Sequence, residues 1–221
     1  MKVIIGIPAF NEEKNIAAIV VKLKKKYDHV LVCDDGSSDM THDIASSLGA
    51  IVVKHPTNLG YGAAIKTIFN EARKIDGDIL ITFDADGQHT AGVLQEVLEP
   101  LLSGKVDMVL GIRSTGFARI SESTFSFYTK LRFGVDDILC GLKGYNIKLY
   151  MTHGCFDSVR SIGTELALSS LKRGVCFQQV HVPTRQRIKG ITRFGSLFGG
   201  NISIFRAFLI AIWADFYNNW D

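Results

Sequence analysis

Short apolar runs rich in β-branched residues alternate with helical stretches over the first 114 residues, and this alternation constrains the fold more than any other feature. Strands that alternate with helices build a mostly parallel sheet with helices on both faces. The sequence therefore predicts an α/β fold around a central, mostly parallel sheet. The expected strands of this half are residues 2–8, 29–35, 50–55, 77–86 and 106–114.

Helices are expected between these strands, because apolar residues recur there at helical spacing. Asn11 is expected to cap the first helix and Asp39 the second, since both residue types accept hydrogen bonds from free helix N–H groups. The expected helical ranges are 11–27, 38–49, 60–74 and 91–103.

The second half of the chain is less regular than the first. Residues 115–134 mix aromatic and basic side chains, and residues 184–196 form a basic loop. Between these two segments, a helix is expected within 163–174 and a strand within 175–183.

The chain of 221 residues is long enough for one sizeable α/β domain with an appendage. No internal repeat or low-complexity linker divides it. We expect one domain over residues 1–200, made of the halves 1–114 and 115–200, and a C-terminal amphipathic helix over residues 201–221.

Charge and cysteine content disfavour several classes of protein. The net charge of +3 is too small to indicate a nucleic-acid partner. The cysteines are widely spaced and form no CxxC pair, so neither a zinc site nor a disulfide framework is expected, and a reducing compartment fits best. The cysteines are Cys33, Cys140, Cys155 and Cys176.

No signal peptide and no apolar stretch long enough to span a bilayer are expected.

The polar clusters of the first half all follow expected strands, where ligands bind in open parallel sheets. Asp84 and Asp86 lie two residues apart, so in an extended segment both point to the same side. They could share a divalent cation such as Mg²⁺ or Mn²⁺, with Gln88 or His89 completing or orienting its shell. The alternative is a solvated acidic turn.

Three further features have both a functional and a structural interpretation. The stretch "DDGSSD" offers Asp34 and Asp35 to the N–H and O–H donors of a base or ribose, or serves only as a helix cap. Gly60 lies in "NLGYGAA" and could let the backbone approach a ligand, or simply form a tight turn. Arg113 ends a strand and could bind phosphate, or form a salt bridge at the surface.

Taken in order, the motifs "IPAFNEE", "DDGSSD", "NLGYGAA", "DADGQH", "GIRS" and "VDDILCGLKGYN" resemble those of the family 2 inverting glycosyltransferases. The resemblance covers about residues 2–200. It is strongest to the branch that contains the dolichol-phosphate mannosyltransferases and related polyprenyl-phosphate sugar transferases. It implies a GT-A fold, a nucleotide-binding α/β sandwich, with residues 1–114 forming the nucleotide-sugar half and 115–200 the acceptor half.

The resemblance also implies roles for individual residues and a GDP- or UDP-linked sugar as donor. Asp84, Asp86 and Gln88 match the metal-binding stretch of the family, with Mg²⁺ or Mn²⁺ as the cofactor. Asp86 and Arg113 are implied in catalysis. The residues implied in binding the nucleotide sugar are Pro8, Asn11, Glu12, Asp34, Asp35, Gly60 and Asp84.

The stretch "VDDILCGLKGYN" matches a family motif in which an acid is followed, after two residues, by S-G-F-R. Asp137 takes the acidic position, whereas Cys140 replaces the serine and Lys143 replaces the arginine. Lysine keeps the positive charge but loses the bidentate fork of arginine. Asp137 is implied in catalysis, and the residues expected to bind the acceptor or its phosphate are Lys143, Arg185, Arg187 and Lys189.

The resemblance predicts an inverting glycosyltransferase that moves a sugar, with mannose or glucose as the best guess, onto dolichyl or polyprenyl phosphate. Such an acceptor is already an anion and needs positioning rather than a general base. If the acceptor is instead a glycan hydroxyl, Asp137 is the candidate base. A non-catalytic nucleotide-binding homologue is a further alternative. A nucleotidyltransferase is disfavoured, because "PAFNEE" is acidic where that class carries a basic glycine-rich loop.

The second half favours a lipid acceptor. The basic loop 184–196 suits a lipid phosphate or an anionic membrane surface. The C-terminal segment carries aromatic residues that are common at membrane interfaces. We therefore expect a cytoplasmic protein that is peripheral at the cytoplasmic face of a membrane, bound to the surface itself or to a small membrane partner protein. The apolar residues at helical spacing are Phe205, Phe208, Leu209, Ile212, Trp213 and Phe216.

Overall fold

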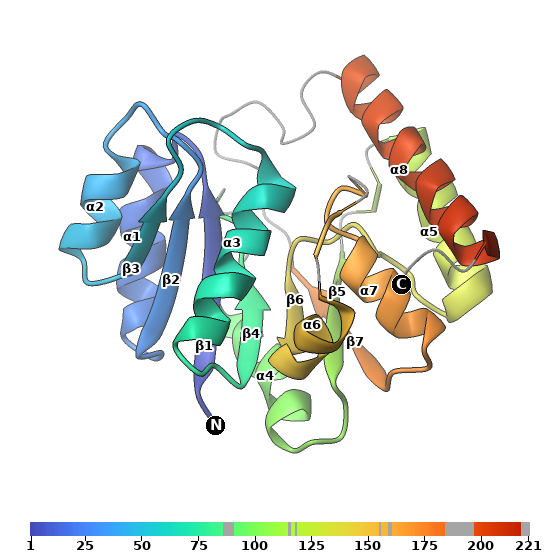
Figure 1. Ribbon diagram of the computed structural model, residues 1–221, viewed down its shortest axis with the longest axis horizontal. Helices are drawn as coiled ribbons and strands as arrows, with labels where there is room; N and C mark the ends of the chain where they lie inside the picture. Colours follow the sequence, from blue (N-terminus) through green and yellow to red (C-terminus); the bar gives the residue numbers. More distant parts are fainter. Residues whose placement is uncertain are drawn as a thin grey trace.

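The computed structural model describes residues 1–85, 91–114, 116–117, 119–154, 156–158, 161–183 and 197–217. In this part of the chain a seven-stranded sheet lies between two layers of helices, which confirms the predicted α/β fold (Figure 1). The strands are β1 (Val3–Ala9), β2 (His29–Asp34), β3 (Ile51–Lys54), β4 (Ile79–Thr82), β5 (Met108–Arg113), β6 (Lys143–Asn146) and β7 (Phe177–Val182). The helices are α1 (Glu13–Lys24), α2 (Thr41–Ser47), α3 (Tyr61–Lys74), α4 (Leu94–Leu102), α5 (Ile120–Phe133), α6 (Ile147–His153), α7 (Glu165–Lys172) and α8 (Leu197–Tyr217), with a 3₁₀ turn at Ala91–Val93.

The strands follow the order β3-β2-β1-β4-β6-β5-β7 across the sheet. β6 runs antiparallel to its neighbours β4 and β5, and the other strands share one direction. The chain steps outward from β1 to β2 and β3 and then returns past β1 to β4. This return creates a topological switch point between β1 and β4, which is where ligands bind in open sheets of this kind.

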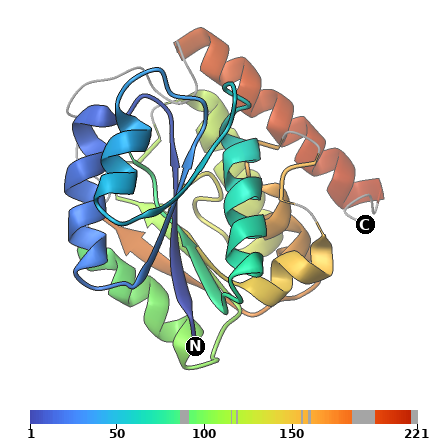
Figure 2. The same ribbon diagram turned by 60° about the vertical axis from the view of Figure 1, so that its left-hand side comes forward.

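Each face of the sheet has its own hydrophobic core, because neighbouring residues of a strand point to opposite faces. Ile4 and Leu80 belong to the core that includes residues of α3, α5, α6, α7 and α8. Ile5 and Ile81 belong to the core under α1, α2 and α4. Figure 2 shows α1, α2 and α4 on one side of the sheet and α3, α6 and α8 on the other. Burial on both faces explains why these strands read as continuous apolar runs.

The sequence does not predict α5, α6 or β6. In α5 the buried face contains Ser121, Glu122, Ser126 and Thr129 beside Phe125, and these polar residues obscure the helical period. β6 has only four residues and is held by pairing to β4 and β5 on both sides. Short elements that depend on their neighbours leave a weak signal in the sequence.

Hydrogen bonds join the loop after β1 to the loop after β2. One of these bonds uses the side chain of Asn11, which is expected to cap α1. Glu12 precedes α1, and its side chain makes no capping bond. Asn11 lies in the left-handed region with φ of 54°, and its Oδ1 accepts a hydrogen bond from the Ser38 N–H at 2.9 Å. The cap predicted at Asn11 is therefore wrong. Asp39, in contrast, accepts a bond from the N–H of Thr41, the first residue of α2, at 3.0 Å.

α8 packs along α5 and also contacts α7 (Figures 1 and 2). It begins at Leu197, ahead of the start at residue 201 that the sequence indicates. Its Phe208 ring packs against Phe125 and Tyr128 of α5, with ring centroids 5.5 Å and 5.7 Å apart. Within the described residues, no helix combines the length and the hydrophobicity needed to cross a bilayer.

Candidate functional site

The polar motifs of the sequence meet at one edge of the sheet. Asp34 and Arg113 are the last residues of β2 and β5, and Asp84 follows β4. Because β6 runs in the opposite direction, its first residue, Lys143, lies at this same edge and pairs with Thr82 of β4. Asp84 therefore lies beside the switch point between β1 and β4, where a ligand is expected.

The loop after β1 is fixed to the loop after β2 through its backbone. Ser37 Oγ accepts a hydrogen bond from the Asn11 N–H at 2.9 Å, and Thr41 Oγ1 accepts one from the Glu12 N–H at 2.7 Å. Pro8 lies within β1 and faces Cys33 of β2. Pro8, Asn11 and Glu12 thus lie at the carboxyl end of β1, where hydrogen bonds join the loop to the one after β2.

Asp35 connects the end of β2 to the loop before α3. Its Oδ1 bonds to His55 Nδ1 at 2.7 Å and accepts a bond from the Leu59 N–H at 2.9 Å, while its Oδ2 accepts one from the Gly60 N–H at 2.8 Å. Gly60 precedes α3 with φ of 94° and ψ of 163°, a conformation that favours glycine strongly. The Asp35 carboxylate is therefore used to shape the loop in which Gly60 lies.

Asp34 is fully buried beside it. Its Oδ1 accepts a hydrogen bond from the Ser37 N–H at 2.9 Å, and its Oδ2 lies 3.6 Å from Lys54 Nζ at the end of β3. Both acids of the motif are thus engaged inside the protein. A direct contact of Asp34 or Asp35 with a base or ribose remains a prediction.

Asp84 lies against a glycine that leaves room for it. A Cβ atom added to Gly141 would lie 1.9 Å from Asp84 Oδ2 and 2.6 Å from its Cγ. The carbonyl of Gly141 accepts a hydrogen bond from Thr82 Oγ1 at 2.7 Å, which ties the segment before β6 to β4. The absence of a side chain at residue 141 therefore leaves the space that the Asp84 carboxylate occupies.

Arg113 and Asp137 form a bidentate ion pair at the end of β5. Arg113 Nε and Nη2 donate to Asp137 Oδ2 and Oδ1 at 2.7 Å and 3.0 Å. Asp137 Oδ1 also accepts a bond from the Leu139 N–H at 3.2 Å. Glu122 of α5 lies 3.5 Å from Arg113 Nη1 and 3.1 Å from Arg119 Nη1. Burial lowers the pKa of Arg113, but the hydrogen bond and charge of Asp137 and the charge of Glu122 raise it above its usual value.

Cys140 and Lys143 occupy the positions where the sequence departs from the family motif. Both side chains are buried at the site edge. Burial, with a further contribution from the charge of Asp137, raises the pKa of the Cys140 thiol to about 12. The thiol is therefore a neutral, weakly polar group at neutral pH, and Lys143 supplies a cation at the start of β6.

We expect Cys33 and Cys140 to resist thiol reagents in the folded protein. Burial and the charges of Asp35 and Asp34 also raise the pKa of Cys33 to about 12, so at about pH 8 only about one thiol in ten thousand is ionised. The test is labelling of a Cys155→Ser/Cys176→Ser variant, which retains only these two thiols. Both should react after denaturation. Rapid labelling of either thiol in the native variant would contradict the prediction.

Several candidate residues lie outside the described part of the chain, and their predicted roles remain predictions. The described residues contain no group of three or more His, Cys, Asp or Glu side chains that could hold a metal ion. Asp84 is thus the described member of the candidate metal stretch. The candidates outside the described residues are Asp86, Gln88, Arg185, Arg187 and Lys189.

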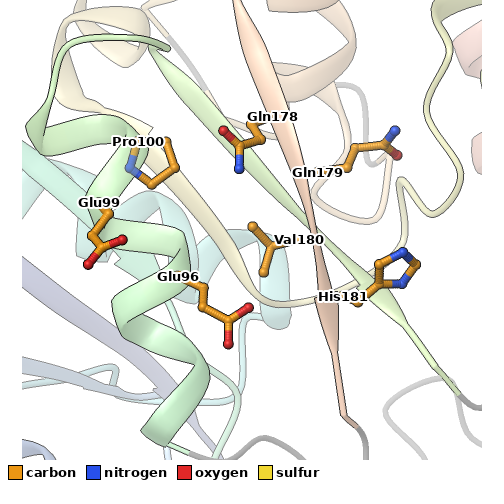
Figure 3. Close-up of a pocket in the computed structure, with 7 residues that line it drawn as sticks. All are labelled: Glu96, Glu99, Pro100, Gln178, Gln179, Val180 and His181. Carbon is orange, nitrogen blue, oxygen red and sulfur yellow. The ribbon is translucent and has the colours of Figure 1, made fainter.

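A pocket of about 360 Å³ lies elsewhere, between α4 and β7 (Figure 3). Glu96, Glu99 and Pro100 line it from the helix, while Gln178 and His181 are among the strand residues that line it. None of the candidate site residues contributes to this pocket. The chemistry indicated by the motifs therefore belongs to the sheet edge and not to this pocket.

Sequence reasoning did not identify three of the residues that shape the site. Gly141 leaves space for Asp84, Glu122 contacts Arg113, and His55 bonds to Asp35. Gly141 lies inside the stretch "VDDILCGLKGYN", so the family motif is the sequence signal that marks this glycine. Glu122 and His55 carry no local signal, because their partners are distant in the sequence.

Comparison with known proteins places these motifs in one family. The model for "Glycosyl transferase family 2" matches residues 4–151, which is more than half of the chain. The matched range contains Asp34, Asp84, Arg113 and Asp137, and so includes the described part of the candidate site.

Three curated relatives extend over different shares of the chain. A Methanocaldococcus jannaschii protein of uncharacterised function is 34% identical over 197 residues, which are 83% of this chain and 81% of that protein. The UDP-N-acetylglucosamine–dolichyl-phosphate N-acetylglucosaminyltransferase of Methanococcus voltae is 35% identical over 125 residues, or 48% of this chain and 50% of that enzyme. The polyprenol monophosphomannose synthase of Mycolicibacterium smegmatis is 28% identical over 197 residues, or 80% and 69%.

Among solved structures, this chain is similar to glucosyl-3-phosphoglycerate synthase from Mycobacterium tuberculosis in complex with Mn²⁺, UDP-glucose and phosphoglyceric acid. The TM-score is 0.76, the identity is 22%, and the match covers 95% of this chain and 79% of that one. The similarity confirms the predicted GT-A fold.

Proposed function

This chain belongs to glycosyl transferase family 2, and from that premise we propose that it transfers a sugar from a nucleotide sugar to dolichyl or polyprenyl phosphate. The two functionally named relatives are named for dolichyl phosphate and for polyprenol monophosphomannose. These names share a polyprenyl-type lipid and differ in the sugar. We therefore propose a polyprenyl-type lipid phosphate as the acceptor and mannose or glucose as the sugar. N-acetylglucosamine is tested as a third sugar.

The observation that carries the choice of acceptor is the pair between Arg113 and Asp137. Both oxygens of Asp137 accept hydrogen bonds from the guanidinium, and the carboxylate is 1% exposed. A carboxylate held in this way is poorly placed to remove a proton from a sugar hydroxyl. A lipid phosphate is already an anion and needs no such base. The geometry therefore favours phosphate over a glycan hydroxyl as the acceptor.

The donor nucleotide is proposed to lie over the carboxyl ends of β1 and β2. Pro8, Asn11 and Glu12 form one side of this region, and Gly60 borders the other with no atom within 4 Å of the position its Cβ would occupy. Asp34 and Asp35 hold the loops between them. This arrangement leaves an open rim where a base and ribose can be bound by backbone groups.

The residues at the switch point fit a divalent cation. Asp84 presents a carboxylate, and Asp86 and Gln88 follow in the sequence as further oxygen donors; hard cations such as Mg²⁺ and Mn²⁺ prefer this donor set. When bound there, the cation would neutralise negative charge on the diphosphate of the donor. The Mycobacterium tuberculosis enzyme described above was crystallised with Mn²⁺, which supports the same cofactor class here.

The proposed reaction is a single in-line displacement at the anomeric carbon of the sugar. A phosphate oxygen of the lipid forms the new C–O bond as the bond to the nucleoside diphosphate breaks, and the anomeric configuration inverts. Lys143 would hold the acceptor phosphate in place, and Arg113 would keep positive charge beside the departing diphosphate. Asp137 would orient Arg113. Arg185, Arg187 and Lys189 are proposed to add positive charge for the acceptor.

A lipid acceptor requires the enzyme to work at a membrane. We propose peripheral attachment at the cytoplasmic face, directly or through a small membrane partner protein. The basic composition of residues 184–196 supports attraction to an anionic surface.

The test is a transfer assay on the purified protein with Mn²⁺ or Mg²⁺. Labelled GDP-mannose, UDP-glucose and UDP-N-acetylglucosamine are offered with and without dolichyl phosphate in detergent. We expect label from one donor to enter the lipid phase. Asp84→Asn should reduce this transfer by about 100-fold or more, because it removes a charge that the cation needs.

The matched control is Asp28→Asn, an exposed acid before β2 at the opposite edge of the sheet, which should leave transfer unchanged. Metal-dependent transfer to a free glycan, with none to lipid, would overturn the proposed acceptor and make Asp137 the candidate base. Nucleotide binding without any transfer would indicate a non-catalytic homologue.

A further inference from the structure

The terminal helix α8 exposes the side that a globular protein usually buries. Surface helices normally turn large apolar side chains to the core and polar ones to solvent. On the side of α8 that faces the core, three alanines, Ala207, Ala211 and Ala214, are buried beside Ile204, and Phe208 is partly buried against α5. The large apolar residues point outwards and are between 47% and 77% exposed: Ile202, Phe205, Leu209, Trp213 and Phe216.

α5 adds a second exposed apolar stripe. Ile120, Phe127 and Leu131 are 83%, 69% and 80% exposed, and their spacing of seven and four residues places them on one side of the helix. Monomeric soluble proteins rarely expose so many large apolar side chains together. This stripe therefore needs an explanation beyond the folding of the domain.

The two stripes form a single surface, because α5 and α8 lie side by side and run in the same direction. Ser121 Oγ donates to Asn201 Oδ1 at 2.7 Å near the start of both helices, and Arg132 Nε donates to Asp215 Oδ2 at 2.9 Å near their ends. On each helix the exposed stripe lies about a quarter-turn from this line of contact, on the side away from the core. We call the eight residues of the two stripes the apolar face.

The exposed charges on α5 and α8 themselves have one sign. α5 and α8 contain one acid each, and both are turned inward. Glu122 is 2% exposed, and Asp215 accepts hydrogen bonds from Tyr128 and Arg132. Burial raises the pKa of Asp215, but these bonds and the charges of Arg132 and Lys172 bring it below its usual value. Arg206 is exposed on α8, and no ion pair joins it to another described residue.

We propose that the apolar face is the surface by which this protein enters the interfacial layer of an anionic lipid bilayer. Large apolar side chains with aromatic residues among them, beside a cation and without an outward acid, match what such a layer binds. A second copy of this chain fits less well. A symmetric dimer through this face would bring two Arg206 side chains together with no outward carboxylate on either helix to pair with them.

The position of the face relative to the site fits a lipid substrate. Glu122 lies in the first turn of α5 and contacts Arg113 at 3.5 Å, so this end of the face adjoins the site edge. Figure 1 shows α8 beginning on the side of the molecule towards which β1 and β2 point. Docking through the face would bring the site close to the headgroup of a lipid acceptor. In this respect the inference rests on the proposed function.

The test measures binding of the full chain to sedimenting vesicles of phosphatidylcholine, with and without about 30% phosphatidylglycerol. We expect stronger binding to the anionic vesicles. Leu209→Gln/Trp213→Gln should weaken binding to both by about tenfold or more. Arg206→Glu should weaken binding to the anionic vesicles alone. The matched control is Met151→Gln on α6, which is 58% exposed but lies away from the face and should bind as wild type.

Folding of each variant is checked by circular dichroism and thermal melting. Unchanged vesicle binding in the folded double variant would overturn the proposal, as would a concentration-dependent dimer that this variant abolishes. Asp84→Asn tests the two proposals separately, because it should lose transfer but keep vesicle binding. On a water-soluble short-chain polyprenyl phosphate, the double variant should keep wild-type transfer, whereas transfer to the long-chain lipid in vesicles should fall by about tenfold.

Discussion

Replacing Gly141 with alanine is expected to lower sugar transfer by about 10- to 100-fold while the protein remains folded. The new Cβ would lie 1.9 Å from Asp84 Oδ2, far inside contact distance. The backbone at residue 141 is held by the hydrogen bond from Thr82 to its carbonyl, so the Asp84 side chain is the group that must move. Its carboxylate then leaves the position proposed for a metal ligand.

The measurement is the apparent affinity for Mn²⁺, followed through metal-dependent nucleotide binding by calorimetry. The matched control is Gly144→Ala in the same segment. A Cβ there would lie 2.7 Å from Leu101 Cδ1 and 2.9 Å from Val97 Cγ1 in the core. This variant should lower the Tm with little change in metal affinity. If Gly141→Ala binds Mn²⁺ like the wild type, the proposed role of Gly141 is wrong.

Replacing Arg113 with alanine is expected to lower the free energy of unfolding by about 3–5 kcal/mol and to remove transfer. Asp137 and Glu122 are 1% and 2% exposed, and the substitution leaves Asp137 without its bidentate partner. A buried carboxylate that loses its counter-charge is far more costly than the pair was favourable. The measurement is denaturant unfolding beside the transfer assay.

A double variant, Arg113→Met/Asp137→Leu, separates stability from activity. It removes both charges together, so it should recover much of the lost stability and still be inactive. Equal instability of the single and double variants would show that the unpaired carboxylate is not the cause. Transfer by the folded double variant would show that neither side chain takes part in the reaction.

Local patterns predicted the first half of the fold well. β1, β2, β4 and β5 are apolar runs that are largely buried, and β3 is a short apolar run at the edge of the sheet, so the signal of each strand is contained within a few consecutive residues. The order of the motifs also indicated the family, and the parallel sheet brings their strand ends to one edge. Helices such as α5 were missed because polar residues on the buried face are satisfied by distant partners, as Ser121 is by Asn201.

The amino-acid sequence by itself determined the α/β class, the family and the residue types available at the strand ends, because these depend on local periodicity and motif spacing. Only the tertiary structure decided which groups meet. The antiparallel insertion of β6 between β4 and β5 brings Gly141 against Asp84 and Lys143 to the site edge. Likewise, periodicity places Phe208 and Leu209 on one helix, but close packing against α5 decides that Phe208 turns inward and Leu209 outward. Contacts between residues far apart in the chain depend on how the layers pack, and that information is not local.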